Sequence, residues 1–250
     1  IVFGDWSSDV CSSDLAWRIA RNTVGYGILF IIINAVSASV VALLLNEVRN
    51  RVAIKTYQTI MILPNFLSWV VVGCISYILL NPELGVVNQA VKFFDGSGVD
   101  WYSDPKHWPV ILTIVNTWKY IGMNSIIYYA ALLGVNQELY EAATIDGANG
   151  LQKCWNISVP SLVPLITMMS ILAVGNILRG DIGLFYQITR DVGALYPTTD
   201  VIDTYIYRGL RTGDMGITSA VGLFQSLVGL VLVVVTNKIV KKIDPDNAMF

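Results

Sequence analysis

The feature that most constrains this chain is a series of long segments with almost no charged side chains. These segments are residues 22–46, 56–82, 108–137, 154–178 and 215–237. Only the third contains a charge, Lys119. Each is longer than the roughly 20 residues that a helix needs to cross the hydrocarbon core of a bilayer. Since the ten-residue alternation of a membrane barrel is missing from the sequence, the pattern predicts an all-α, polytopic membrane protein with five spans.

Composition supports this prediction and narrows the chemistry. Apolar residues make up 54% of the chain and charged residues 14%, whereas soluble domains carry about a quarter charged residues. A net charge of −2 gives no reason to expect nucleic acid. The cysteines (Cys11, Cys74, Cys154) lack metal-binding spacing, and His107 beside Trp108 is expected at the membrane interface. We therefore expect no metal, no cofactor and no catalytic residue.

The first residues differ from the rest of the chain. Residues 7–9 and 12–14 both read Ser-Ser-Asp, in a polar stretch without periodicity. We predict that residues 1–16 are a non-native segment and that residues 17–250 form the transmembrane domain.

Boundary signals refine the expected spans. The second is expected to have Pro64 near its start, where proline is tolerated, whereas a deeper proline would kink the helix. The third is expected at 109–133, the fourth at 159–178 and the last at 217–235. Between the last two, residues 200–211 have an apolar stripe at helical spacing, with acids early and bases late, which predicts an amphipathic helix capped by Thr199. Asp181, just after the fourth span, could gate the outer mouth or simply be solvated.

A polar insert separates the third and fourth spans. It reads Glu-Ala-Ala-Thr-Ile-Asp-Gly-Ala over residues 141–148. Asn136 is a good N-cap for a helix over 137–145, and Gly147 supplies a left-handed stop. A second short helix over 151–157 is expected to end before Pro160 opens the next span. The two helices would form a rigid elbow, with small alanines that let another protein approach closely.

This insert resembles the EAA signature of the membrane subunits of binding-protein-dependent ABC importers. The matching positions are Glu141, Ala142, Ala143, Asp146, Gly147, Ala148, Ile157, Pro160 and Pro164. The resemblance implies the MetI-like permease fold and makes the insert a coupling helix that sits in a cleft of a cytoplasmic ATPase. The alternative is an ordinary interfacial helix with a glycine stop. A higher density of Lys and Arg at 47–55 and in the tail agrees with a cytoplasmic elbow.

Other stretches resemble the LplB-type sugar permeases, relatives of the MalF maltose-importer subunit. They are residues 45–49, 63–70, 80–82 and 196–205. This resemblance implies an oligosaccharide substrate, a bacterial cytoplasmic membrane location, a second permease subunit in a heterodimer, ABC ATPase subunits and an extracytoplasmic sugar-binding protein. In that family one more span precedes the first one visible here, so a first span is expected to be missing.

The sequence contains no phosphate-binding loop of the pattern G-x-x-x-x-G-K-[ST], so ATP hydrolysis must come from a separate chain and no enzyme activity is expected. A charge near the middle of the third span is costly unless it faces protein or water. Polar and aromatic neighbours could line a sugar pathway with it: Lys119, Trp118, Tyr120, Asn116, Asn124 and Tyr128. The alternative is a buried helix contact in which Lys119 pairs with an acid of the partner subunit.

Three alternative functions can be compared with this prediction. The same scaffold could import a non-sugar solute such as a peptide or an amino acid. An ion-coupled secondary transporter would need intramembrane acids or broken helices in matching halves, and the five spans contain no carboxylate. A membrane-embedded enzyme would need clustered His, Asp or Glu at bilayer depth, and the spans contain none.

Overall fold

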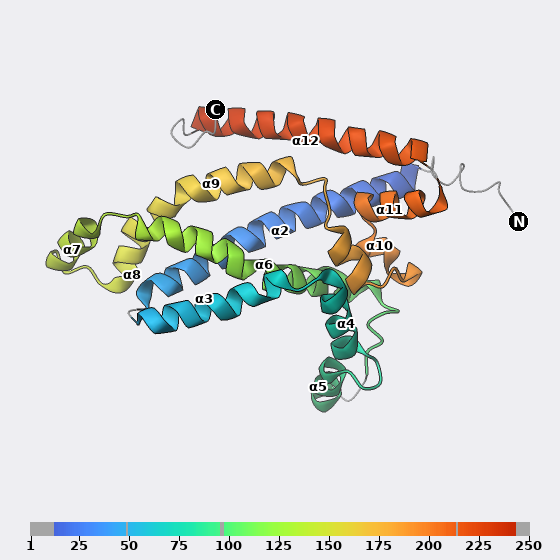
Figure 1. The fold of residues 1–250 in the computed structure, drawn as a ribbon, viewed down its shortest axis with the longest axis horizontal. Coiled ribbons are helices and arrows are strands. Elements are labelled where there is room, and N and C mark those ends of the chain that lie inside the picture. The colour runs from blue at the N-terminus through green and yellow to red at the C-terminus, as the bar shows by residue number, and fades with distance from the viewer. Residues whose placement is uncertain (1–12, 49, 96–97, 214, 244–250) are drawn as a thin grey trace, which may run out of the picture. The chain divides into compact units, whose positions relative to one another are not determined.

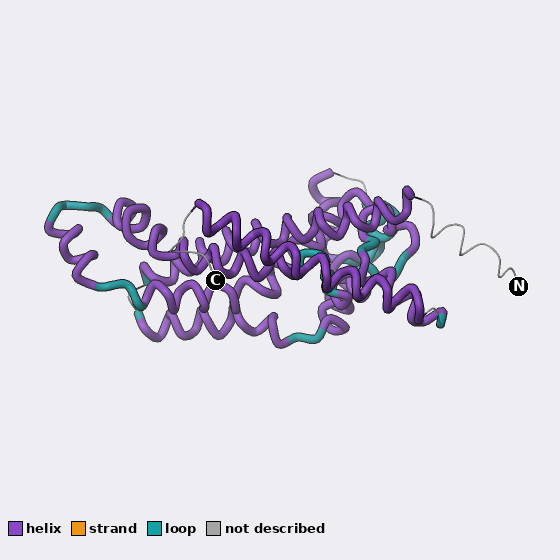
Figure 2. Tube along the Cα trace, turned by 90° about the horizontal axis from the view of Figure 1, so that it is seen from above, coloured by secondary structure: helices purple, strands orange, loops and turns teal. Residues whose placement is uncertain are grey.

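The described part of the chain consists of helices joined by loops. The computed structural model describes residues 13–48, 50–95, 98–213 and 215–243. The elements are α2 (Ser13–Glu47), α3 (Arg51–Phe66), α4 (Trp69–Leu80), α5 (Val86–Asp95), η1 (Pro105–His107), α6 (Trp108–Leu133), α7 (Gln137–Ile145), α8 (Gly150–Lys153), η2 (Cys154–Ser158), α9 (Val159–Gly175), η3 (Gly183–Ile188), η4 (Gly193–Leu195), α10 (Tyr196–Thr199), α11 (Ile202–Thr212) and α12 (Met215–Ile243). Figure 2 shows helices joined by loops, with no strand among the described residues. The all-α prediction is confirmed.

Three helical stretches are long and apolar enough to cross a membrane: Asp14–Glu47, Gly150–Gly175 and Thr218–Lys242. The bent pair α3 and α4 adds a fourth if it is counted as one broken span. Helix α6 has 26 residues and therefore a length of about 39 Å, but its polar side chains lower its hydropathy. These helices agree with the predicted polytopic character.

The predicted position of Pro64 in the second span is wrong. Helix α3 ends at Phe66, and α4 begins at Trp69 after Ser68, whose hydroxyl accepts the N–H of Val71 at 3.4 Å. Pro64 lies in the last turn of α3 and not near the start of a span. Its ring removes one main-chain donor and crowds the carbonyl four residues earlier, which weakens the turn that precedes it. The cap by Ser68 then starts a new helix.

Contacts divide the chain into two compact units. The first contains the described residues of Ile1–Leu29, Leu67–Asn116 and Asn176–Gly229, and the second those of Phe30–Phe66, Thr117–Gly175 and Leu230–Phe250. The predicted non-native segment is not tested by this division. Residues 1–12 lie outside the described part, and residues 13–16 begin α2.

In the first unit, polar groups of α2 hold the start of α11. The Asn22 amide donates to the carbonyls of Pro197 at 3.2 Å and Asp200 at 3.1 Å. The N–H of Ile202 donates to the Thr23 hydroxyl at 3.0 Å. An apolar cluster of Ile19, Leu178 and Ile202 packs beside these bonds. Because these polar groups satisfy one another, they can be buried without leaving an unpaired donor.

The amphipathic helix is confirmed as α11, but its predicted cap is wrong. The hydroxyl of Thr199 donates to the carbonyl of Leu195 and so belongs to the preceding turn. The Thr204 hydroxyl instead accepts the N–H of Val201 at 3.1 Å and donates to the Asp200 carboxylate. The basic residue Arg208 pairs with Asp200 and Asp191, so it packs as part of a buried network as well as complementing the helix dipole.

Two carboxylates form hydrogen bonds with the segment that follows α9. Asp181 accepts the indole N–H of Trp69 at 2.8 Å and the N–H of Gly183 at 2.9 Å, which joins α4 to η3. Asp203 accepts the N–H of Gly180 and, at 3.4 Å, the amide of Gln225 from α12. Burial raises the pKa of Asp203 above its usual value, and the bonds from Gly180 and Gln225 lower it by less.

This shift predicts a pH dependence that the variant Asp203→Asn should lack. Because the folded protein keeps the Asp203 proton where the unfolded chain has already lost it, the free energy of unfolding falls as the pH rises above the ordinary carboxyl pKa. The asparagine keeps an acceptor for Gly180 but cannot ionise. Thermal unfolding in detergent from about pH 4 to about pH 7 should therefore show the variant gaining stability relative to wild type as the pH rises. Glu83→Gln at an exposed site is the control. A difference that does not change with pH would contradict this expectation.

Candidate functional site: an exposed helical elbow

The elbow formed by α7 and α8 grows from the core of the second unit. That core joins Ala38 and Ala42 of α2 to Tyr128 and Leu132 of α6 and to Leu162 of α9, all almost fully buried. Two alanines one turn apart let helices approach closely, as small residues do in membrane bundles. Within this unit, α7 and α8 lie together beyond the ends of α3, α6 and α9 (Figure 1). The elbow therefore projects from a well-packed base.

Local bonds determine where α7 begins and ends. The side chain of Asn136 accepts the N–H of Glu138 at 3.0 Å, which confirms the predicted cap. Gly147 has φ of +78°, which confirms the predicted left-handed stop. The N–H of Ala148 donates to the carbonyl of Ala143 at 2.9 Å, and that of Gly147 to Thr144 at 3.1 Å. This pair of main-chain bonds is a Schellman motif, so Gly147 of the signature has a conformational reason for its position.

The prediction of a second short helix ending before Pro160 is wrong. Helix α8 continues through the π-helical turn η2 into α9, as one helical stretch over Gly150–Gly175. Asn149 and Gln152 form a capping box that starts it. Pro160 cannot donate to the carbonyl of Asn156, and the N–H of Val159 donates to Cys154, five residues back. The widened turn accommodates the proline without ending the helix.

Two side-chain bonds hold the arms of the elbow together. The hydroxyls of Tyr140 on α7 and Ser158 on η2 lie 2.9 Å apart, and Ser158 is buried. The ammonium of Lys153 on α8 donates to the Thr144 hydroxyl at 2.7 Å. None of these four residues is predicted from the sequence, since nothing in their spacing distinguishes them from solvated polar groups. These two bonds hold the two helices of the elbow at one angle.

Large apolar side chains lie exposed on the elbow. Ile145 is 87% exposed, Leu151 69% and Leu139 52%. Fully burying such a side chain is worth about 1.5–3 kcal/mol, so this surface gains by contact with another apolar surface. The carboxylates of Glu141 and Asp146 are also exposed and take part in none of the ion pairs within the described residues.

The remaining signature residues line the two arms with different exposure. Ala142, Pro160 and Pro164 are exposed, whereas Ala143, Ala148 and Ile157 are half-buried. Both prolines lie in α9 after the widened turn, so they belong to the arm that continues into the membrane-crossing stretch. The structure thus brings Glu141 to Ala148 together on α7 and its stop, and leaves the prolines on the other arm.

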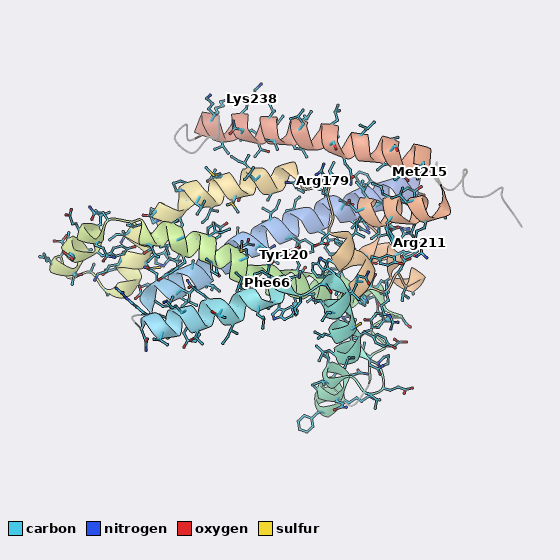
Figure 3. All side chains as sticks on the ribbon, viewed as in Figure 1. Phe66, Tyr120, Arg179, Arg211, Met215 and Lys238 are labelled. Carbon is cyan, nitrogen blue, oxygen red and sulfur yellow. The ribbon has the colours of Figure 1, made fainter. Side chains whose placement is uncertain are left out.

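The predicted pathway residues of α6 do not share one exposed face. Trp118 is 43% exposed, and Tyr120, labelled in Figure 3, and Asn124 are half-buried. Asn116 and Lys119 are buried, and Tyr128 lies in the core at the base of the elbow. The predicted pathway role stays a prediction for the whole set. Within the described ranges, no cluster of three or more His, Cys, Asp or Glu could hold a metal ion.

Comparison with known proteins gives one consistent result. Residues 35–246 match the family described as "Binding-protein-dependent transport system inner membrane component". Protein LplB of Bacillus subtilis is 32% identical over 244 residues, covering 97% of this chain and 76% of LplB. The polygalacturonan/rhamnogalacturonan transport system permease protein YteP of the same organism is 35% identical over 202 residues, covering 80% of this chain and 62% of YteP.

A solved structure agrees with these relatives. A bacterial ABC transporter involved in the import of the acidic polysaccharide alginate contains a chain with a TM-score of 0.88 and 33% identity to this one. The match covers 98% of this chain and 85% of that one. A second structure, of the alginate transporter in complex with an alginate pentasaccharide-bound periplasmic protein, matches with a TM-score of 0.87.

The bonds at the end of α7 predict different effects for two glycine substitutions. Gly147→Ala should destabilise the stop by about 1–2 kcal/mol, because a Cβ is strained in left-handed backbone, although open space surrounds it. Amide exchange over residues 143–149 should rise about tenfold, with faster tryptic cleavage after Lys153. Gly150→Ala, also in open space but helical, is the matched control and should change neither. Equal effects of the two substitutions would refute the role given to the left-handed stop.

Proposed function

We propose that this chain, which belongs to the family of binding-protein-dependent transport system inner membrane components, moves an oligosaccharide across the cytoplasmic membrane by alternating access. As a member of that family it is a multi-pass permease subunit of an ABC importer and is not itself an enzyme. The observation that carries the mechanism is the elbow: a rigid, capped structure with exposed apolar side chains.

Names of relatives support a sugar substrate. YteP is named for polygalacturonan and rhamnogalacturonan, and a further relative, AraP of Halalkalibacterium halodurans, is named for arabinooligosaccharides. The solved transporter of the same fold imports alginate. All of these are oligomers or polymers of sugars. An oligosaccharide is therefore the substrate class that we assign to this chain.

The proposed assembly contains chains of three further kinds. ABC ATPase subunits supply the hydrolysis for which this sequence has no phosphate-binding loop. An extracytoplasmic sugar-binding protein delivers the substrate, as supported by the alginate transporter with its periplasmic protein. A second permease subunit completes a heterodimeric pore.

The elbow is proposed to receive the motion of the ATPase on the cytoplasmic side. Ile145, Leu139 and Leu151 would be buried in a cleft of the ATPase, with Glu141 and Asp146 meeting basic or amide groups at its rim. Since α8 runs without a break into α9, a displacement of the elbow would move the whole stretch Gly150–Gly175. The bonds Tyr140–Ser158 and Thr144–Lys153 would keep the two arms from flexing separately.

For the substrate, we propose that the accessible part of the α6 set contacts the sugar. Trp118 offers an exposed ring, and Tyr120 and Asn124 offer polar groups that are half-buried. Aromatic faces and amides suit sugars, which present C–H faces and hydroxyls. Asn116 and Tyr128 would support these residues from buried positions.

Substitutions on the elbow should uncouple the importer. Ile145→Ser removes the most exposed apolar side chain of the elbow, and Glu141→Lys reverses an exposed charge. Each should lower sugar uptake and substrate-stimulated ATP hydrolysis by the assembled importer at least about tenfold, because interface anchors are worth about 2 kcal/mol or more. Leu84→Ser, at an exposed leucine outside the elbow, is the control. Wild-type coupling in both elbow variants would remove the elbow from the mechanism.

Trp118→Ala tests the pathway. Loss of one aromatic contact should raise the KM for oligosaccharide uptake about 2- to 10-fold while basal ATP hydrolysis stays unchanged. Met123→Ala, on the same helix and equally exposed at 43%, should leave the KM unchanged. An unchanged KM in the Trp118 variant, or equal changes in both, would place the pathway elsewhere.

A further inference from the structure

The end of α3 leaves main-chain carbonyls that the helix cannot satisfy. In a continuous helix the carbonyls of Pro64 and Asn65 would accept the N–H groups four residues later, but α3 ends at Phe66. Pro64 is buried. A bare carbonyl away from water costs free energy comparable to a lost hydrogen bond. Some donor from another helix is therefore needed at this point.

Lys119 of α6 supplies that donor. Its ammonium donates to the carbonyl of Pro64 and to that of Asn65, both at 3.3 Å, and the residue is only 4% exposed. The C-terminal end of a helix carries partial negative charge, so a cation here gains electrostatic as well as hydrogen-bond energy. This arrangement is a buried helix contact, as one of the two sequence alternatives expected, but here the ammonium bonds main-chain carbonyls of the same chain.

The next turn of α6 lets α3 come close enough for this bond. A Cβ built on Gly122 would lie 1.9 Å from the carbonyl oxygen of Met61 and 2.7 Å from the nitrogen of Ile62. Ser125, one turn further, is fully buried, and its hydroxyl bonds back to Gly122. Figure 3 labels Phe66 on α3 and Tyr120 on α6, the neighbours of the residues that meet here. Glycine and lysine at this spacing thus join the two backbones.

We infer that Lys119 is a positioning residue for transport, which holds the broken end of α3 in place through its charge and does not bind the sugar. Its ammonium is buried against two carbonyls, so it has neither the exposure nor the geometry of a group awaiting a ligand. This inference rests on the proposed function and refines its substrate pathway. The charge of Lys119, in the middle of α6, then serves to stabilise the break between α3 and α4.

The test compares four variants in the assembled importer. Lys119→Met removes the charge at similar volume, and Lys119→Arg restores it. Gly122→Ala displaces α3 while leaving Lys119 in place, and Lys106→Met, at an exposed lysine, is the matched control. Each is measured for the KM and maximal rate of oligosaccharide uptake in proteoliposomes, for thermal unfolding, and for hydrogen exchange over residues 60–70.

Lys119→Met and Gly122→Ala should lower the maximal rate at least tenfold with the KM within twofold of wild type, and should raise exchange at the end of α3. Lys119→Arg should recover at least half of the rate, and Lys106→Met should change nothing. A KM that rises tenfold in Lys119→Met with unchanged exchange would make Lys119 a sugar ligand and overturn the inference. Wild-type rates in that variant would overturn it as well.

Two safeguards keep the result decisive. Should Lys119→Met fail to accumulate in the membrane, Gly122→Ala and Lys119→Arg answer the question by the same readouts. A wild-type importer that moves no oligosaccharide would refute the proposed function. Hydrogen exchange over residues 60–70 would still show whether Lys119 stabilises the end of α3.

Discussion

A main chain inside lipid has no water to bond to, so a helix that breaks or widens within a membrane-crossing stretch needs other groups of the protein to satisfy its freed donors and acceptors. Where α3 stops, Lys119 bonds the carbonyls that would otherwise be bare. Where Pro160 withholds a donor, a π-helical turn rearranges the ladder. Where α11 begins, Asn22 and Thr23 reach across from α2. At these three points a side chain or a local turn satisfies the main chain.

The elbow satisfies its main chain through local bonds. Helix α7 is capped by Asn136 at one end and by the Schellman bonds around Gly147 at the other, so its backbone is largely satisfied without help from outside. Its side chains are therefore available to a partner. The base of the elbow packs on Ala38, Ala42 and Leu162, which lie in the core of its own unit.

Much of this arrangement was predictable from sequence, and the limits are physical. Caps and glycine stops act within a few residues, so Asn136, Gly147 and the limits of α7 followed from local rules. The long uncharged runs likewise predicted a membrane protein. The break between α3 and α4 was missed because Pro64 alone does not tell a kink from a helix end. The bonds Tyr140–Ser158 and Lys153–Thr144 join elements that no local rule pairs.

The bonds from the Lys119 ammonium to the end of α3 have one more consequence. Half-helix ends within membranes are places where transporters bind exchangeable sodium or protons. In this chain such an end is already occupied by a cation attached to the polypeptide, which cannot dissociate or be replaced from either aqueous compartment. That broken helix end therefore takes its balancing positive charge from the polypeptide and not from the surrounding salt.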